Sequence, residues 1–438
     1  MSINGLSARG AKAANSPARV DLELYFEAAQ NLYNRETNPE GAFPLNVAEN
    51  KLNWPALQDK IAQITRKEKV ADWASRYGNP AGVDSFREAV ADYLAEYLFG
   101  CPVAGETLAF SSGLTSTIEQ TAFVVAEPGD VAVIPAPSYP VYTGDLGVKS
   151  GVKRYDLQTH HDISELQDGL PLQIADLEKA QEEITNRGER FRILILTTPD
   201  NPTGGIYSQE QLESIAKWCI DHEVHLIVNE IYGISRIDTS HPAIREDYSS
   251  PTDFQSFGPM MAELKSPYLH LWYSFSKDFG ISGFRIGLIH SHNADLIRAY
   301  GNVNLTHSVS NLTQWLMERV LHDQDFVKSY LAENQKRLTE AYAVVATALK
   351  KMHTPYNPSR GSLFIWMDLS ELLAEPTSEA EEALWLEIYH STGILLTPPH
   401  GFGHTKKGLY RMVISYFQPE DIQVAMDRLS GFVKGRRK

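Results

Sequence analysis

The chain has 438 residues, of which 43% are hydrophobic and 22% charged, a composition typical of a globular protein with an ample core. Its formal net charge of −15 argues against a nucleic-acid partner. Two cysteines (Cys101 and Cys219) without a metal-ligand cluster, and no apolar stretch of bilayer length, predict a cytoplasmic protein with no metal site, no disulfide framework and no membrane span.

The first 20 residues are small and polar and lack an apolar signal core, which predicts a flexible tail or an arm over a partner. Further along the chain, Ser85 and Glu88 have the spacing of a capping box. We therefore expect a helix that opens at Ser85 and runs through Tyr97.

Several short apolar runs are continuous rather than alternating, as expected of strands that are covered on both faces. These runs are 131–135, 192–197, 224–228, 269–273 and 286–290. Between two of them, Ser208 and Gln211 form a second capping box ahead of a helical pattern that extends to Ile220. This alternation predicts an α/β fold with a mainly parallel sheet flanked by helices, which binds ligands at the carboxyl ends of its strands.

The pattern changes from about residue 311. A long helical stretch (313–351) precedes an apolar run at 361–368, a helix near 379–392 and a strand-like run at 410–416. We therefore expect a large domain at 66–310, which carries the sheet and the site. A smaller α+β domain would combine 21–65 with 311–438.

The most informative stretch begins at the end of the run 269–273. It contains Ser274 and Lys277, followed by a glycine-punctuated turn and Arg285. A charged lysine at a buried strand end is costly, and burial would lower its pKa and make it a usable nucleophile. Ser274 and Arg285 both suit a phosphate. A nucleophilic lysine beside a phosphate site is what pyridoxal 5'-phosphate requires, so we predict that cofactor.

The same tetrad, Ser274 to Lys277, also matches the Ser-x-x-Lys motif of penicillin-binding enzymes. That reaction requires a downstream Ser-Asp-Asn and Lys-Thr-Gly, and the sequence has neither. A solvated lysine at a sheet edge is the remaining alternative.

Two further motifs suit a phosphorylated ring. Gly113 allows close backbone approach, and its amide neighbours at Leu114 with the Thr115 hydroxyl would offer donors at a helix N-terminus. Tyr139 lies among prolines after the run 131–135 and would stack on a flat ring. The alternatives are a plain helix cap and a rigid turn with a packed tyrosine.

The next two strands also end in polar residues. Asn201 follows the run 192–197, and its side chain would donate to a ring oxygen. After the run 224–228, Asn229 would face the ring nitrogen and Tyr232 would donate to the phenolate oxygen of the cofactor. Each motif alone is an ordinary turn or polar loop.

Two residues are candidates for more distant contacts. Tyr77 would reach a phosphate, across a subunit interface, unless its segment is a plain turn. Arg411 would bind a substrate carboxylate bidentately, or form a structural ion pair. Four histidines near these motifs are expected to be solvated: His160, His161, His400 and His404.

With these residues in this order, the chain resembles fold-type I pyridoxal-phosphate enzymes of the aspartate aminotransferase family over about residues 44–432. Within that family it is similar to the 1-aminocyclopropane-1-carboxylate (ACC) synthase branch. The stretches that carry this similarity are Ala48-Glu49-Asn50-Lys51-Leu52, 273–280 and 283–287.

The resemblance implies a role for each candidate. Lys277 would form the internal aldimine and shuttle the α-proton. The phosphate would be held by Ser274, Arg285 and the turn Gly113-Leu114-Thr115, with Tyr77 from a second subunit. The ring would be held by Tyr139, Asn201, Asn229 and Tyr232.

The substrate is implied to be an amino acid, a small molecule. Arg411 would hold its α-carboxylate, Glu49 would line its pocket and Asn201 would also contact it. The resemblance further implies a homodimer with shared active sites, and isologous dimers are the commonest oligomers.

Two positions depart from the family pattern. The family has aspartate at the position of Asn229, where the acid keeps the ring nitrogen protonated and makes the ring an electron sink. A neutral amide would disfavour transamination and favour attack of the carbanion within the substrate, although it would slow the first deprotonation. In the synthase branch a tyrosine stands two residues before the glycine that matches Gly82. Here that residue is Pro80, and Tyr77 has the aminotransferase spacing.

We therefore expect a pyridoxal-phosphate-dependent enzyme of amino acid metabolism. The first hypothesis is ACC-synthase-like γ-elimination and cyclisation, or γ-substitution, on S-adenosylmethionine or a related amino acid. The alternative is a class I/II aminotransferase that transfers an amino group from an L-amino acid to a 2-oxo acid. A non-catalytic protein that acts through interaction is the third.

Overall fold

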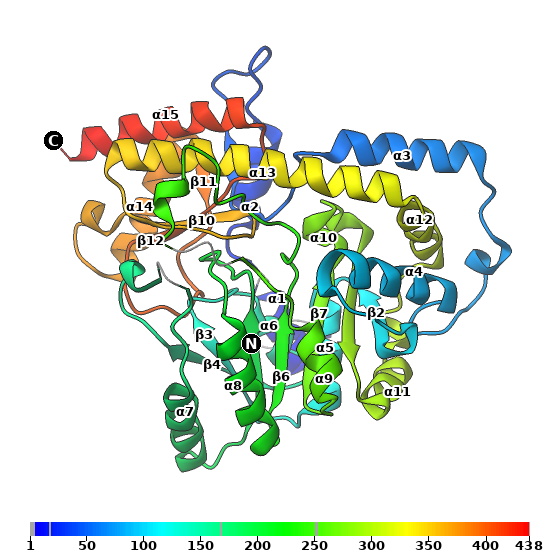
Figure 1. Ribbon diagram of the computed structural model, residues 1–438. Coiled ribbons are helices and arrows are strands. Elements are labelled where there is room, and N and C mark those ends of the chain that lie inside the picture. The colour runs from blue at the N-terminus through cyan, green and yellow to red at the C-terminus, as the bar shows by residue number, and fades with distance from the viewer. Residues whose placement is uncertain (1–4, 17–18, 167–168, 250–252, 438) are drawn as a thin grey trace.

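The computed structural model describes residues 5–16, 19–166, 169–249 and 253–437, and a seven-stranded sheet lies at its centre (Figure 1). In spatial order the strands are β2 (Leu108–Ser112), β8 (Ile286–Ser291), β7 (Leu269–Ser274), β6 (His225–Asn229), β5 (Phe191–Thr197), β3 (Val131–Ala136) and β4 (Lys153–Gln158). The neighbours from β7 to β4 are parallel. All the predicted strands and the α/β fold class are confirmed.

Strand β8 runs against both of its neighbours, β7 and β2. Residues 275–285 alone connect β7 to β8. A parallel crossover needs a dozen or more residues, so this short connection turns the chain back on itself. The turn begins with the short helix α10 (Phe275–Asp278), which carries Lys277.

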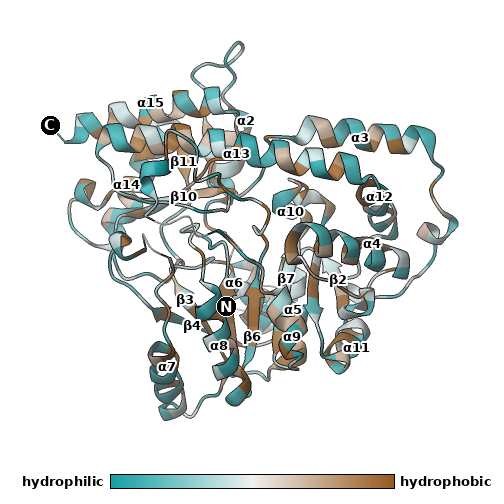
Figure 2. Ribbon diagram, in the orientation of Figure 1, coloured by the Kyte–Doolittle hydropathy of each residue, from teal (hydrophilic) through white to brown (hydrophobic). Residues whose placement is uncertain are grey.

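Helices cover both faces of the sheet, as the continuous apolar strands require. Alternate strand residues pack against α5 (Leu114–Val125), α6 (Tyr142–Gly147) and α11 (Ala294–Val303) on one face. The others pack against α4 (Asp84–Leu94), α7 (Ile174–Asn186), α8 (Gln209–Asp221) and α9 (Gly258–Leu264). Figure 2 shows the hydrophobic colour of β6 inside this layer. Each buried Leu or Ile contributes about 1.5–3 kcal/mol to folding.

Two smaller sheets lie apart from the large one in sequence. Strand β1 (Phe43–Leu45) pairs in parallel with β11 (Ile394–Leu396). Strand β10 (Phe364–Asp368) pairs antiparallel with β9 (Tyr356–Asn357) and β12 (Leu409–Val413). These five strands fall within 21–65 and 311–438, and the division of the chain into two domains at those boundaries stays a prediction.

Long helices accompany the smaller sheets. Helices α13 (Gln324–Met352) and α15 (Pro419–Arg436) run side by side (Figure 1). The remaining helices are α1 (Ala8–Ala14), α2 (Leu22–Gln30), α3 (Trp54–Lys67), α12 (Asn311–His322) and α14 (Ser378–Thr392). Helix α1 lies within the predicted N-terminal tail.

Helix boundaries differ from prediction in two places. The capping box at Ser208 and Gln211 is present at the start of α8. The box predicted at Ser85 is wrong, because α4 begins at Asp84 and the Ser85 hydroxyl donates to Glu318 Oε2 at 2.8 Å. Helix α4 ends at Leu94, and a π-turn continues over 95–99.

The single long helix predicted over 313–351 is also wrong. Asp323 interrupts it and separates α12 from α13. The Asp323 side chain accepts a hydrogen bond from the Phe326 amide at 3.0 Å and forms an ion pair with Lys60, so it caps the second helix. Strand β4, which was not predicted, is an edge strand with several half-exposed residues, so it lacks a continuous apolar run.

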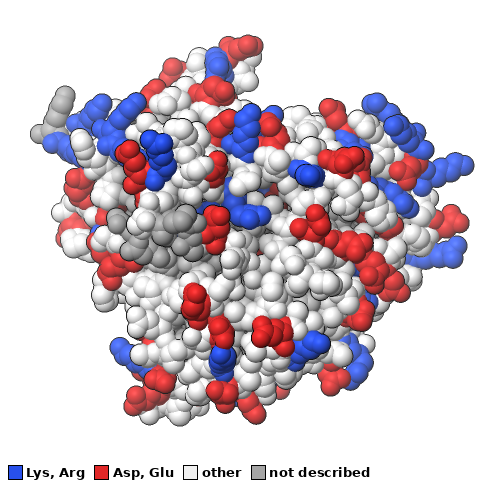
Figure 3. All heavy atoms as spheres, in the orientation of Figure 1, with Lys and Arg blue, Asp and Glu red and all other residues white. Residues whose placement is uncertain are grey.

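Within the described ranges, no helix has the length and apolar character needed to cross a membrane. No group of three or more His, Cys, Asp or Glu side chains among the described residues is placed to hold a metal ion. On the face drawn in Figure 3, acidic and basic side chains are interspersed.

Candidate active site

One edge of the large sheet carries most of the predicted site residues. Strands β3, β5, β6 and β7 end at this edge, and Tyr139, Asn201, Asn229 and Lys277 end these strands or follow them closely. Strand β8 runs the opposite way, so Arg285, just before its start, lies at the same edge. The prediction that the motifs share a strand-end edge is therefore consistent with the observed topology.

Lys277 lies on α10, and its side-chain amine points toward the segment that contains Ala48 and Glu49. Its Nζ donates to the carbonyl of Ala48 at 2.5 Å. Burial, together with the positive charges of Arg411, Arg285 and Arg19, lowers the pKa of Lys277 to about 8, whereas Glu49 opposes the shift. An amine with this pKa is substantially neutral near pH 8, as a nucleophile requires.

The pKa of Lys277 has a kinetic consequence. Below a pH of about 8 the neutral amine becomes about tenfold scarcer with each pH unit. We expect the rate at which the apoprotein captures pyridoxal phosphate, followed by visible absorbance, to rise with pH and level off near pH 8. A rate that kept rising to the pKa of an ordinary lysine, about 10.4, would contradict this.

A compact cradle lies between Gly113 and Arg285. Gly113 has a φ of 86° and caps the N-terminus of α5. A Cβ added to Gly113 would come within 2.2 Å of Arg285 Nη2, and one added to Gly287 within 2.5 Å of the Leu114 amide nitrogen. Thr115, in the first turn of α5, is exposed. A helix N-terminus beside a guanidinium offers the donors that a phosphate needs.

Arg285 and Ser274 are held by backbone carbonyls. Arg285 Nη1 donates to the Ser282 carbonyl at 2.8 Å, and Nη2 to that of Ser112 at 3.4 Å. The buried Ser274 hydroxyl donates to the Ile286 carbonyl at 2.6 Å and accepts from the Ser276 amide, which caps α10. Ser274 therefore also joins the strand end to the turn that carries Lys277.

The orientation of the Asn229 amide is set by the backbone. The Ile231 N–H donates to Asn229 Oδ1 at 3.2 Å, so this atom is the oxygen. Asn229 Nδ2 then donates to the hydroxyl of Tyr142 at 2.9 Å, and that hydroxyl lies 3.2 Å from Thr197 Oγ1. Because an amide nitrogen has two N–H bonds, Asn229 offers donors to its surroundings where an aspartate would offer only acceptors.

Arg411 lies on β12 and is buried. It donates through Nη1 to Asn201 Oδ1 at 2.7 Å and through Nη2 to the Asn46 carbonyl at 3.0 Å. Its Nε donates to Thr397 Oγ1 at 3.1 Å. Each terminal nitrogen carries a second N–H bond, which suits a carboxylate. Burial lowers the pKa of Arg411 to about 10, which still leaves it charged at neutral pH.

Several aromatic rings lie at the site, and one of them packs on Arg411. The guanidinium of Arg411 lies 4.2 Å from the centroid of Phe364. The buried Tyr232 packs edge-on against the same ring, with centroids 5.4 Å apart. Tyr139 packs edge-on against Tyr142 at 5.3 Å. Burial raises the pKa of both Tyr139 and Tyr232, so both hydroxyls keep their protons and are available as donors.

Glu49 and Tyr77 lie differently from the other candidates. The Glu49 carboxylate is near enough to Lys277 to influence its pKa, but it pairs with Lys51 at 3.2 Å. Tyr77 is fully exposed at 102%, and the structure does not bring it to the other site residues within one chain. Its predicted contact from a second subunit stays a prediction.

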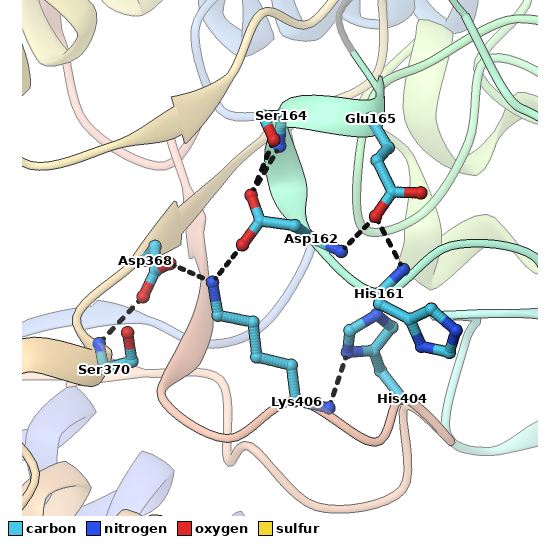
Figure 4. Close-up of polar contacts among 8 residues, drawn as sticks. All are labelled: His161, Asp162, Ser164, Glu165, Asp368, Ser370, His404 and Lys406. Atoms are coloured by element: carbon cyan, nitrogen blue, oxygen red, sulfur yellow. Dashed lines mark hydrogen bonds and ion pairs between the residues drawn. The ribbon is translucent and has the colours of Figure 1, made fainter.

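A cluster of charged and histidine side chains holds the loop at 397–408 that carries Thr397 (Figure 4). Lys406 Nζ binds Asp162 and Asp368, both at 2.7 Å, and so ties the loop to the segment after β4. The expectation of solvated histidines is wrong for His160, which is buried, and for His404, which is half-buried and packs on His160 at 5.0 Å. His161 and His400 are exposed.

Several residues of this edge were not anticipated from sequence. They are Asn46, Ala48, Tyr142 and Phe364. Ala48 lies beside Glu49 and was passed over because its contribution is a backbone carbonyl. The others act on candidates that are remote in sequence, and no local motif marks them.

Together these residues fit pyridoxal phosphate. The cradle at Gly113 is too tight for a Cβ, it faces a guanidinium, and a lysine of lowered pKa stands on the same turn as that guanidinium. Asn46 Oδ1 and Thr198 Oγ1 are among the buried polar atoms that have no hydrogen-bond partner in the described residues. Sheet, lysine and cradle define the class of fold-type I enzymes, whose members use pyridoxal phosphate.

Comparison with known proteins specifies the family. The chain belongs to the aminotransferase class I and II family, whose model matches residues 44–429. It is 30% identical over 416 residues to 1-aminocyclopropane-1-carboxylate synthase of Glycine max, and the aligned residues cover 92% of this chain and 83% of that protein. It is 31% identical over 385 residues to the enzyme of that name from Vigna radiata var. radiata, with 84% and 99% covered.

Solved structures show the same fold. An archaeal alanine:glyoxylate aminotransferase superposes with a TM-score of 0.80 at 19% identity, with 98% of each chain covered. Aspartate aminotransferase from Thermus thermophilus with maleate superposes with a TM-score of 0.74 at 20% identity, with 98% of this chain and 100% of that chain covered. The fold and family predictions are confirmed.

Proposed function

We propose that Lys277 binds pyridoxal 5'-phosphate and that the chain transforms a small L-amino acid at its α- and γ-carbons, as an ACC-synthase-like lyase or γ-transferase. The observation that carries this proposal is the lysine of lowered pKa at the same sheet edge as a buried guanidinium. The substrates considered are S-adenosylmethionine and related amino acids with a γ-leaving group.

The cofactor, when bound, supplies an aldehyde for the substrate amine and a ring that withdraws electrons from the α-carbon. Arg411 would bind the α-carboxylate, and Asn201, which orients Arg411, would contact the ring oxygen together with Tyr232. Lys277 Nζ would accept and return the α-proton. The phosphate would be held by Arg285, the turn Gly113-Leu114-Thr115 and, after its hydroxyl turns from the Ile286 carbonyl, Ser274. Tyr139 would cover the ring.

The similarity to ACC synthases over most of the chain and the amide at Asn229 favour the lyase. Aminotransferase activity, with a 2-oxo acid as acceptor, is the second candidate, and the spacing at Tyr77 favours it. Incubation of the holoprotein with single amino acids separates the two. A cyclised or γ-substituted amino acid supports the first, and a keto acid formed in an amount equal to the enzyme supports the second. No product and no spectral change with any amino acid would contradict both.

We also propose a cytoplasmic homodimer with shared active sites. The full exposure of the Tyr77 ring supports this, because a residue that completes a neighbouring site must project from its own chain. Sedimentation of the holoprotein tests the dimer. Mixing a Lys277→Ala chain with a Tyr77→Ala chain tests the sharing, since it would restore part of the activity only if sites are shared.

Replacement of Asn229 by aspartate is expected to shift the products. A carboxylate accepts where the amide donates, so it would hold a proton on the cofactor's ring nitrogen. We expect keto acid formation to gain about tenfold over the lyase products, a change of about 1.4 kcal/mol in relative barrier. The measurement is product partition, together with the 15N chemical shift of ring-labelled cofactor.

Asn293→Asp is the matched control for this change, because Asn293 is a helix N-cap away from the site and aspartate caps equally well. Unchanged partition and an unchanged 15N shift in the Asn229→Asp protein would remove the argument from the amide.

A further inference from the structure

An ion pair near the start of the chain lies beside the site. Arg19 Nε donates to Asp21 Oδ1 at 3.0 Å, and Arg19 Nη2 pairs with Asp21 Oδ2. The Asp21 side chain is only 2% exposed, whereas that of Arg19 is 28% exposed. The carboxylate is therefore inside, and the guanidinium lies between it and the surface. Nitrogen Nη1 of Arg19 takes no part in the pair.

Asp21 is connected to Arg411 through one residue. The buried Asn46 donates through Nδ2 to Asp21 Oδ2 at 2.6 Å. The backbone carbonyl of Asn46 accepts from Arg411 Nη2 at 3.0 Å and from Thr397 Oγ1 at 3.0 Å. Both oxygens of Asp21 are thus bound, and a short chain of hydrogen bonds fixes the Arg19 guanidinium relative to that of Arg411.

The charge of Arg19 acts on the same space as the site residues. It is one of the positive charges that add to the lowering of the pKa of the buried Lys277 and Arg411, and it opposes the rise in the pKa of Tyr139 that burial causes. Glu49, the carboxylate whose negative charge raises the pKa of Lys277, is itself paired with Lys51. Once Arg285 holds a phosphate and Arg411 an α-carboxylate, the Arg19 guanidinium is still available to a third anionic group.

We propose that Arg19, anchored by Asp21, is a specificity-determining residue that binds an anionic group on the substrate side chain. This inference rests on the proposed function and deepens it. A guanidinium with a free N–H edge binds carboxylates and phosphonates through paired hydrogen bonds and repels cations. Among the substrates of the proposed function, this favours a related amino acid whose side chain carries an anionic group over S-adenosylmethionine, whose sulfonium the guanidinium would repel.

Calorimetric titration of the holoprotein tests this with substrate-like acids. The probes are glutarate, with two carboxylates, 3-phosphonopropanoate, with a phosphonate in place of one of them, and pentanoate, with only one acid group. We expect the two dianions to bind about tenfold or more tightly than pentanoate, because a hydrogen bond to a charged group contributes about 1.5–3 kcal/mol. Comparison of the two dianions shows which acid the pocket prefers.

Arg19→Gln is expected to abolish the preference for dianions and to leave pentanoate binding within about twofold, because Arg411 is retained. Arg35→Gln is the matched control, since Arg35 is another arginine of the N-terminal region and pairs with Asp421 on the surface. It should change neither affinity.

Equal binding of dianions and pentanoate by the unaltered protein would overturn the proposal. So would a loss of both in Arg19→Gln, because that result assigns Arg19 to the positioning of Arg411 alone. Visible absorbance of the holoprotein reports cofactor capture before any titration, so a failure of the proposed function is recognised separately.

Discussion

Lys277→Ala is expected to abolish covalent capture of pyridoxal phosphate and to lower turnover by at least about 10⁴-fold, since loss of a covalent nucleophile costs rates of this order. Nζ of Lys277 is the amine whose burial and cationic neighbours keep it neutral near pH 8. The measurement is mass spectrometry after borohydride treatment, combined with the rate of product formation.

Lys51→Ala is the control for this experiment. Lys51 lies near the site, pairs with Glu49 and rests 3.8 Å from the centroid of Tyr416. Its removal should leave the borohydride adduct at Lys277 unchanged. An adduct of normal yield in the Lys277→Ala protein, or its appearance at another lysine of the native chain, would refute the assignment of the cofactor-binding residue.

Arg411→Lys is expected to raise KM for the amino acid by about 100-fold while cofactor capture persists. Lysine keeps a positive charge but loses the planar fork that faces Asn201, Thr397 and the Asn46 carbonyl. Loss of a paired contact to a carboxylate costs about 1.5–3 kcal/mol, which corresponds to this range of affinity. The measurement is KM together with the stability of the variant in urea.

Arg428→Lys provides the comparison. Arg428 also lies over an aromatic ring, 5.1 Å from the centroid of Phe43, and also donates to backbone carbonyls, those of Gly41 and Thr392. It contacts none of the proposed substrate residues. If both variants lost stability equally and KM stayed unchanged in Arg411→Lys, Arg411 would be a structural residue.

The layout of the large sheet could be predicted from sequence because its strands are local and continuous. The runs at β3, β5, β6, β7 and β8 are apolar on both faces, and helix α8 carries its own capping box. The lysine, the glycine turn and the arginine before β8 also lie in short motifs. Edge strand β4 has no such run, because only Leu157 of its six residues is buried.

What could not be predicted depends on contacts between remote segments. Asn229 is held by Tyr142, and Arg411 by Asn46, Thr397 and Asn201. Neither partnership follows from spacing, since each depends on how the loops after different strands meet. The same holds for His160 and His404, which bury each other although both lie in polar segments.

The reversal of the chain between β7 and β8 has a consequence for how this protein can change over evolution. It places Lys277, the proposed covalent anchor, and Arg285, the proposed phosphate anchor, on one short hairpin, so the residues proposed to hold the two ends of the cofactor are inherited as a unit. Arg19, the residue proposed to meet the side chain of a substrate, comes instead from the N-terminal region, far from this hairpin in sequence. New substrates can thus be acquired by altering peripheral segments while the chemistry is preserved.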